Sequence, residues 1–122
     1  MKLHLNQHTN RNQFTAHGAG YVMVNGQRHE QPLVVTPDEV LSGCLPASFD
    51  ALEMAHFDAL LELQPEVVLF GSGNQLRFPH PSLYQALSRA RIGVECMDTP
   101  AACRTYNILM SEDRKVVAMI LL

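Results

Sequence analysis

Residues 65–73 read Pro-Glu-Val-Val-Leu-Phe-Gly-Ser-Gly, and this stretch decides the fold class. Val67–Phe70 is a continuous apolar run, which is typical of a strand that is covered on both faces. Pro65 ends the element before it, because the residue before a proline avoids the helical region. The strand then leads directly into the loop Gly71-Ser72-Gly73. We therefore predict that residues 65–122 form an open α/β arrangement.

Strands and helices alternate through this second part of the chain. The strands are expected at Glu66–Phe70, Ile92–Met97 and Val116–Leu121. Pro81 fits the first turn of the helix between the first two strands. Asp98 or Thr99 caps the next helix, with Pro100 just inside it. A β-α-β-α-β order of this kind implies right-handed crossovers and strands that are at least partly parallel.

The first 47 residues predict a β-rich meander followed by a loop. Asn25-Gly26 between two short alternating runs is a strong hairpin signal, because both central residues of a type I′ turn need positive φ. Pro32 and Pro37 bound a further short strand and favour an edge position for it. The expected strands of this part are Gln13–His17, Gly20–Val24, Gln27–His29 and Leu33–Val35.

Two amphipathic helices complete the expected fold. One runs from Ser48 as N-cap to about Leu63. The other is the helix capped by Asp98 or Thr99, and it runs to about Met110. Their buried stripes are predicted to be Leu52, Ala55, Ala59, Leu60 and Leu63 in the first, and Ala101 or Ala102, Thr105, Ile108 and Leu109 in the second. We thus expect one domain, residues 1–122, with a three-layer α/β fold. Its central sheet is mixed, partly parallel and flanked by helices, with an N-terminal β-hairpin or meander.

Composition restricts the class of function. The 122 residues fit one domain, and a net charge of −3 gives no basic field for nucleic acid. No apolar run reaches ~18 residues, so no membrane span is expected. Met1–Asn12 lacks the apolar core of a signal peptide. The three cysteines, Cys44, Cys96 and Cys103, show no pairing pattern. These features favour a cytoplasmic protein with reduced thiols.

The loop Gly71-Ser72-Gly73 is the first candidate for a site. It follows a buried strand, at the end where open α/β sheets bind ligands, and glycine lets a backbone approach a ligand closely. Leu76 stands where a dinucleotide fingerprint would have its third glycine. Two interpretations stay open, a tight turn that only leaves the strand or one wall of a site for an anion or small molecule.

The helix N-terminus at Asp98 is the second candidate. Free N–H groups and the positive end of the dipole favour anions there, and parallel strands would bring Asp98 and Gly71 to the same edge of the sheet. Arg77 and Arg104 are candidates to converge on the cleft between them. The alternative is that Asp98 or Thr99 only caps the helix. The candidate ligand-binding residues are Gly71, Ser72, Gly73, Arg77, Asp98, Thr99, Cys103, Arg104 and Asn107.

Catalytic chemistry is weakly indicated. Cys103 lies in the first turns of a helix beside an arginine, which can lower a thiol pKa, but a nucleophilic cysteine normally needs a histidine base. His80 is the candidate base, and a buried, unreactive thiol is the favoured interpretation. The histidines show no metal-binding spacing, and no catalytic or nucleotide-binding motif is present. We predict no catalytic residue, metal or cofactor.

Three stretches carry a resemblance to a known family. They are Gly20–Gly26, Pro65–Gly73 and Gly93–Leu109, of which Asp98-Thr99 with Ala102–Asn107 is the most specific. From about Phe14 onward, the chain resembles a family of small α/β domains of unknown function. That family includes mitochondrial complex I assembly factor 3 and an adipogenesis-associated Mth domain-containing protein. The resemblance implies a three-layer fold with an added β-hairpin region and implies no catalytic activity. Members usually carry threonine where this chain has Ser72, which keeps a hydroxyl.

These observations favour a non-enzymatic binding module or assembly-factor-like protein. The alternative is an enzyme that acts on a small molecule or anion in the cleft between Gly71–Gly73 and Asp98–Arg104. A scaffold that acts only as a homo-oligomer is a third possibility. The expected partners are another protein, a second copy of the chain or a small anion, with no nucleic acid.

Overall fold

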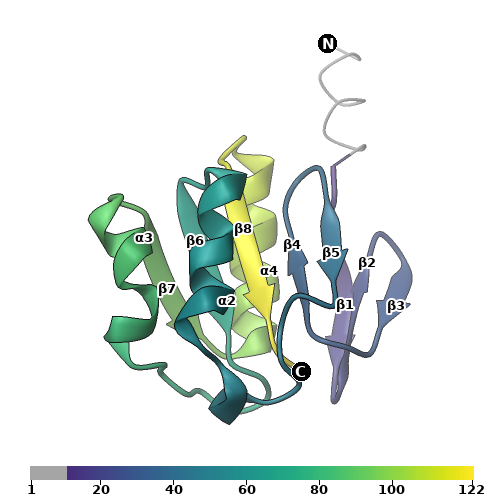
Figure 1. The fold of residues 1–122 in the computed structure, drawn as a ribbon. Coiled ribbons are helices and arrows are strands. Elements are labelled where there is room, and N and C mark those ends of the chain that lie inside the picture. The colour runs from purple at the N-terminus through teal and green to yellow at the C-terminus, as the bar shows by residue number, and fades with distance from the viewer. Residues whose placement is uncertain (1–10) are drawn as a thin grey trace.

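A mixed sheet of five strands forms the centre of the computed structural model, which describes residues 11–122 (Figure 1). The strand order is β5-β4-β8-β6-β7. β6 pairs in parallel with both β7 and β8, whereas β4 is antiparallel to β5 and β8. The predicted mixed sheet is thereby confirmed. The edge position expected for β4 is wrong, because β4 lies between β5 and β8, and β5 forms where a loop was expected; Pro32 and Pro37 flank β4 and do not interrupt its ladder. The strands are β4 (Leu33–Val35), β5 (Val40–Ser42), β6 (Val67–Gly71), β7 (Gly93–Met97) and β8 (Val116–Ile120).

A second sheet of three antiparallel strands lies beside the first. It consists of β1 (Phe14–Gly18), β2 (Tyr21–Val24) and β3 (Gln27–His29), in that order. Asn25 and Gly26 join β2 to β3 with φ values of 52° and 82°, as the type I′ turn requires. The meander predicted from Asn25-Gly26 is confirmed.

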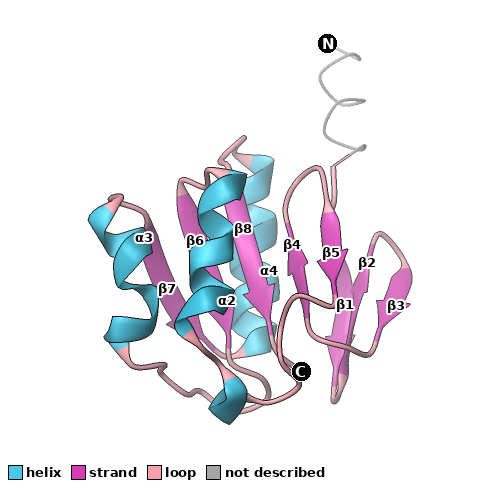
Figure 2. Cartoon of the chain, in the orientation of Figure 1, coloured by secondary structure: helices cyan, strands magenta, loops and turns pink. Residues whose placement is uncertain are grey.

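Helices cover both faces of the five-stranded sheet (Figures 1 and 2). In the view of Figure 1, α2 and α3 lie in front of the sheet and α4 lies behind it. The helical segments are the 3-10 turns η1 (Phe49–Ala51), η2 (Ala59–Leu63) and η3 (Pro81–Tyr84), and the α-helices α2 (Met54–Asp58), α3 (Gln85–Arg89) and α4 (Thr99–Ser111). This arrangement confirms the three-layer α/β fold.

β6 explains why its sequence is continuously apolar. All of its residues are buried, and successive side chains enter opposite layers. Val67 and Leu69 join the core beneath α4 and the three-stranded sheet, whereas Val68 and Phe70 join the core beneath α2 and α3. A strand that is covered on both faces cannot alternate between apolar and polar residues.

The single helix predicted from Ser48 to Leu63 is wrong. The backbone is extended at Leu52, with ψ 138°, so η1 ends there and α2 starts anew after Glu53. The Glu53 backbone N–H donates to His56 Nδ1 at 2.9 Å and closes a reciprocal cap, which fixes a new helix start. Ser48 precedes η1 but makes no side-chain cap.

The buried stripe predicted for α4 is also wrong in part. Ala102 is buried as one of the alternatives, but Ile108 is 58% exposed. The helix turns a different face to the sheet, and that face consists of Thr99, Ala102, Cys103, Tyr106 and Met110. Tyr106 packs edge-on against Phe14, with ring centroids 5.2 Å apart. Three of these five residues are Thr, Cys and Tyr, so an apolar count does not single out this face.

Candidate functional site

The Gly71-Ser72-Gly73 loop is hydrogen-bonded to the start of α4. The Gly73 N–H donates to Thr99 Oγ1 at 2.9 Å, and the Thr99 N–H donates back to the Gly73 carbonyl at 2.9 Å. The Thr99 hydroxyl in turn donates to the Leu121 carbonyl at 2.6 Å. The Ser72 N–H is bound by the Met97 carbonyl at 2.9 Å. The two expected walls of the cleft are therefore joined through their own donors and acceptors.

Gly71 is needed where β6 passes beneath α4. A Cβ atom at this position would lie 2.9 Å from Thr99 Oγ1 and 3.2 Å from the Ala102 Cβ. Gly73 has φ 103°, a conformation that strains other residues. Both glycines thus have a packing role, which is what the tight-turn interpretation requires.

Ser72 organises the loop that follows. Its hydroxyl donates to the Gln75 carbonyl at 2.7 Å and accepts the Arg77 N–H at 3.1 Å. The Arg77 guanidinium lies 4.1 Å from the centre of the Phe49 ring and forms an ion pair of 3.0 Å with Asp50. Arg77 is thus directed towards η1, on the α2 and α3 side of the sheet.

Arg104 lies on the other side of the sheet. It is exposed on α4 and borders a groove of about 370 Å³ between α4 and β1. One wall of this groove is Phe14–His17, and the other consists of Cys103, Arg104 and Asn107. The structure does not bring Arg77 and Arg104 together. Ligand binding by the nine candidate residues stays a prediction.

Asp98 and Asn107 have defined contacts. The Asp98 carboxylate accepts the Ala101 N–H at 2.9 Å, so Asp98 and not Thr99 is the side-chain cap of α4. Asn107 acts on β1: its Oδ1 accepts the Phe14 N–H at 2.9 Å, and its Nδ2 donates to the Phe14 carbonyl at 2.7 Å. We call this pair of bonds the Asn107 clasp. The sequence offers one signal for it, an asparagine in the middle of a helix, where asparagine is otherwise unfavourable.

Cys103 is buried on the inner face of α4. Burial raises the pKa of its thiol to about 12, against a smaller lowering by the Arg104 charge. The histidine proposed as its base is engaged elsewhere, because His80 Nδ1 accepts the Ser82 N–H at 3.1 Å and caps η3. A buried thiol of raised pKa is a poor nucleophile, which supports the interpretation of Cys103 as an unreactive core residue.

Cys103 is expected to make the fold sensitive to alkali. The unfolded thiol loses its proton above its ordinary pKa of 9.0, whereas the folded thiol keeps its proton until about 12. The free energy of unfolding should therefore fall as pH rises through this window, by at most about 1.4 kcal/mol per pH unit. Urea denaturation at increasing pH measures this slope. Cys103→Ala should reduce it and the exposed Cys44→Ala should not, with the remaining slope due to Tyr106, whose pKa is also raised by burial. Equal slopes in all three proteins would contradict the prediction.

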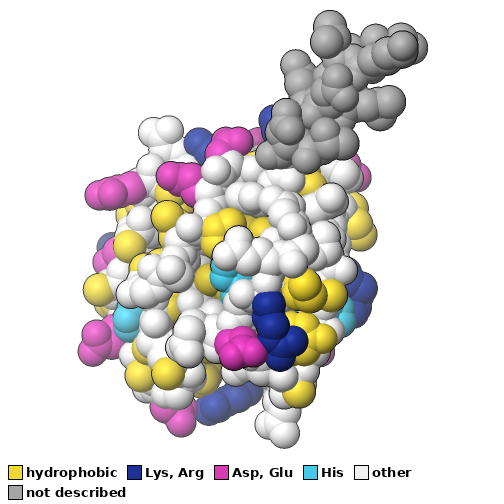
Figure 3. Space-filling model, turned by 90° about the vertical axis from the view of Figure 1, so that its right-hand side faces the viewer, with side chains coloured by type: hydrophobic (Ala, Val, Ile, Leu, Met, Phe, Trp, Pro, Cys, Tyr) yellow, Lys and Arg dark blue, Asp and Glu magenta, His cyan; other side chains and the backbone are white. Residues whose placement is uncertain are grey.

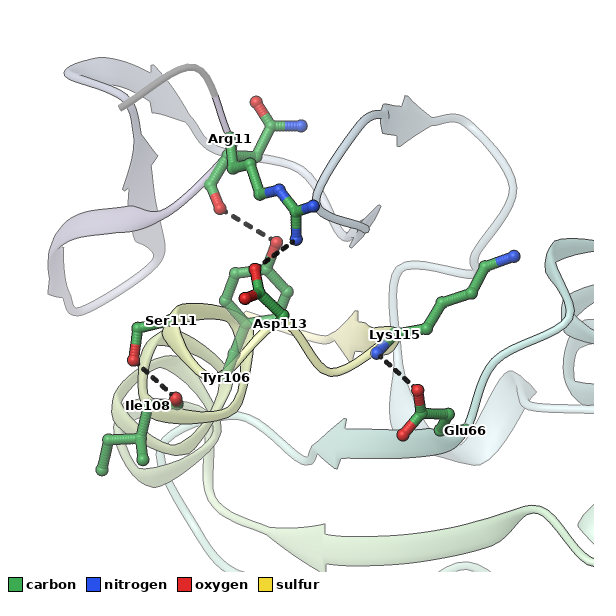
Figure 4. A network of polar contacts seen from close by, with 8 residues as sticks. Arg11, Glu66, Tyr106, Ile108, Ser111, Asp113 and Lys115 are labelled. Atoms are coloured by element: carbon green, nitrogen blue, oxygen red, sulfur yellow. Dashed lines mark hydrogen bonds and ion pairs between the residues drawn. The ribbon is translucent and has the colours of Figure 1, made fainter. Parts of the chain in front are cut away.

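A larger hollow of about 610 Å³ lies near the start of β8. The charged residues around it were not predicted from the sequence. Arg11 pairs with Asp113 at 3.5 Å, and Arg114 pairs with Glu66 at 2.8 Å (the first pair is drawn in Figure 4). The hydrogen bonds from Arg114 and from the Lys115 backbone lower the pKa of Glu66. Within residues 11–122, no group of three His, Cys, Asp or Glu side chains is placed to hold a metal.

Fold and site together define a small three-layer α/β domain whose second, antiparallel sheet is clasped to its long helix. Residues 14–121 match the family described as "Protein of unknown function (DUF498/DUF598)", and the chain belongs to this family. The family resemblance predicted from the sequence is confirmed.

Relatives and solved structures agree with this assignment. The chain is 36% identical to the mouse NADH dehydrogenase (ubiquinone) 1 alpha subcomplex assembly factor 3. The match covers 73% of the chain and 49% of the mouse protein. It is 27% identical to a "13 kDa major membrane protein" of Francisella tularensis subsp. holarctica, covering 88% of the chain and 89% of the relative. The crystal structure of a Bordetella parapertussis protein superposes with a TM-score of 0.85 at 35% identity, covering 91% and 95% of the two chains. None of the helices in residues 11–122 has the length and apolar character that crossing a membrane requires.

Proposed function

We propose that the chain is a non-enzymatic protein-binding module that acts in the manner of an assembly factor. The observation that carries this proposal is the loop between β6 and η3, residues 72–80, which we call the β6–η3 loop. It displays two large apolar side chains to solvent: Leu76 is 53% exposed and Phe78 is 68% exposed. Exposed apolar side chains that lie close together mark sites of protein contact more often than isolated ones.

The β6–η3 loop is held in its shape from within. Ser72 binds the backbone at Gln75 and Arg77, and Arg77 is anchored on Phe49 and Asp50. The residue between Leu76 and Phe78 thus ties the loop to η1. A loop that is already ordered loses little conformational entropy on binding, so its apolar side chains are efficient anchors.

The comparisons support a binding role in a general way. The mouse relative is named as an assembly factor, and the chain corresponds to about half of that protein. Support for the alternative, an enzyme acting in the Gly71–Gly73 and Asp98–Arg104 cleft, is weaker, because the N–H groups of Ser72, Gly73 and Thr99 donate to acceptors within the fold. A cytoplasmic location and a single domain over residues 1–122 stay predictions.

The β6–η3 loop can be tested by affinity capture. Wild-type chain and the double variant Leu76→Ser, Phe78→Ser serve as bait, and bound proteins are quantified by mass spectrometry. Proteins captured specifically by the wild type should be recovered at least about tenfold less with the variant, as expected for loss of an apolar anchor. The exposed surface of η1, which supports the loop, is left unchanged.

Ile108→Ser provides the matched control. Ile108 is equally apolar and 58% exposed, but it lies on α4, on the other face of the sheet. Capture should be unchanged in this variant. Equal recovery with all baits, or no specific protein with the wild type, would contradict the proposed function. Thermal denaturation of each variant establishes that the fold is intact.

Other exposed surfaces carry less weight. Figure 3 faces the side of the molecule on the right of Figure 1, and its hydrophobic side chains form separate groups with charged and polar side chains between them. On the three-stranded sheet, Arg28 lies over the Tyr21 ring at 3.8 Å and pairs with Glu30. Such mixed surfaces are ordinary for a folded domain.

A further inference from the structure

We propose that the groove between β1 and α4 binds an extended acidic peptide segment of a partner protein. The segment adds to the unpaired edge of β1 and places a carboxylate on Arg104. This site is separate from the β6–η3 loop, and the proposal does not depend on the function proposed above. Three observations carry it: the edge of β1, the charge of the groove and the Asn107 clasp.

The first observation is that β1 has a strand on one edge only. It pairs with β2, and within the described residues no other strand pairs with it. The register shifts between Phe14 and Ala16, which separates Phe14 from the rest of β1. Ala16 and Gly18 use their backbone groups in the ladder with β2, whereas the backbone N–H and C=O of His17 face away from β2, beside the groove. An unpaired strand edge presents backbone donors and acceptors that can bind an extended chain.

The Asn107 clasp shows that this side of β1 accepts strand-like bonds. The amide of Asn107 both accepts from the Phe14 N–H and donates to the Phe14 carbonyl, at 2.9 and 2.7 Å. A neighbouring strand would make the same two bonds with one residue. The side chain thus takes the place of a strand at the first residue of β1 and leaves the outward-facing backbone groups of His17 open.

The positive charge of Arg104 in the groove favours a partner with acidic side chains. Among residues 11–122, Arg104 and His17 are the only ionisable side chains on its walls apart from the buried thiol of Cys103, and no carboxylate of these residues borders it. Arg104 makes no ion pair within residues 11–122, unlike Arg77, which pairs with Asp50. The larger hollow near β8 differs, because charges of both signs line it. An unpaired guanidinium is suited to bind a carboxylate through two parallel hydrogen bonds.

These features together define a mode of recognition. Main-chain hydrogen bonds to His17 would supply affinity, and the guanidinium of Arg104 would supply the preference for an acidic side chain. The groove volume of about 370 Å³ is enough for a few residues of an extended chain, but not for a folded domain. The expected ligand is therefore a short acidic segment and not a broad protein surface.

The test is an NMR titration of the ¹⁵N-labelled chain with a short peptide in which valine alternates with glutamate. Amide shifts should be confined to β1 and the part of α4 around Arg104. Arg104→Gln should weaken binding at least about tenfold, as expected for loss of a charge-assisted hydrogen bond. The control Arg89→Gln, which removes an arginine from α3 on the opposite face, should leave the affinity unchanged.

Two further arms make each outcome decisive. A peptide of alternating valine and lysine should not bind the wild type but should bind Arg104→Glu, because the charges are then exchanged. Free glutamate and inorganic phosphate should shift the Arg104 region only weakly. The proposal is overturned if either small anion binds as tightly as the acidic peptide, if the peptide shifts other regions, or if it does not bind. A dimer formed through β1 in light scattering would also overturn it.

Discussion

Replacement of Thr99 by valine is expected to lower the free energy of unfolding by about 2–4 kcal/mol. Valine keeps the shape and β-branching of threonine, and removes only the hydroxyl. Thr99 is 5% exposed, so water cannot replace the lost bonds. The Gly73 N–H and the Leu121 carbonyl would both lose a partner, which they now reach at 2.9 and 2.6 Å. Equilibrium unfolding in urea measures the difference.

Thr105→Val is the matched control for this prediction. It makes the same chemical change on the same helix, at a half-buried position whose hydroxyl has no hydrogen bond within residues 11–122. Its effect should be close to zero. If the two variants were equally stable, the hydrogen bonds of the Thr99 hydroxyl to Gly73 and Leu121 would not stabilise the fold.

Gly71→Ala is expected to cost about 1–3 kcal/mol, the usual penalty of an added methylene in a well-packed core. The new Cβ would lie 2.9 Å from Thr99 Oγ1 and 3.0 Å from Ile120 Cδ1. Neither neighbour can move freely, because Thr99 is held by its hydrogen bonds and Ile120 is fully buried. Thermal or urea denaturation would report the loss.

Gly93→Ala separates this steric effect from the general effect of removing a glycine. Gly93 begins β7, the strand next to β6, and a Cβ there would meet only Glu95 Oε2 at 3.7 Å, an ordinary contact. This variant should be neutral or slightly stabilising, because alanine restricts the unfolded chain. A loss of stability as large as that of Gly71→Ala would contradict the steric argument.

The sequence predicts the sheet better than the helices, and the reason is physical. Val67–Phe70 and Val116–Ile120 are buried on both faces, so their apolar character is visible without knowledge of their neighbours. The break at Leu52 depends on a local competition: the cap between Glu53 and His56 wins over continuation of the helix. Apolar spacing contains no information about such a cap.

The candidate site shows a similar division. Gly71, Gly73 and Thr99 meet, as the parallel strands β6 and β7 lead one to expect. Arg77 and Arg104 do not meet, because long side chains follow local partners that sequence spacing does not reveal. Arg77 finds the Phe49 ring and Asp50, and Arg104 projects from the helix on the opposite face.

The position of β8 has a consequence for the order in which the chain folds. β8 lies between β4 and β6, although it comes later in the chain than either. The two parts of the sheet therefore cannot join during synthesis until residues 116–120 have left the ribosome. Contacts between such distant residues slow folding, and until they form, β4 and β6 keep open edges that favour aggregation. β6, the apolar strand that decides the fold class, therefore keeps one edge unpaired until β8 has been synthesised.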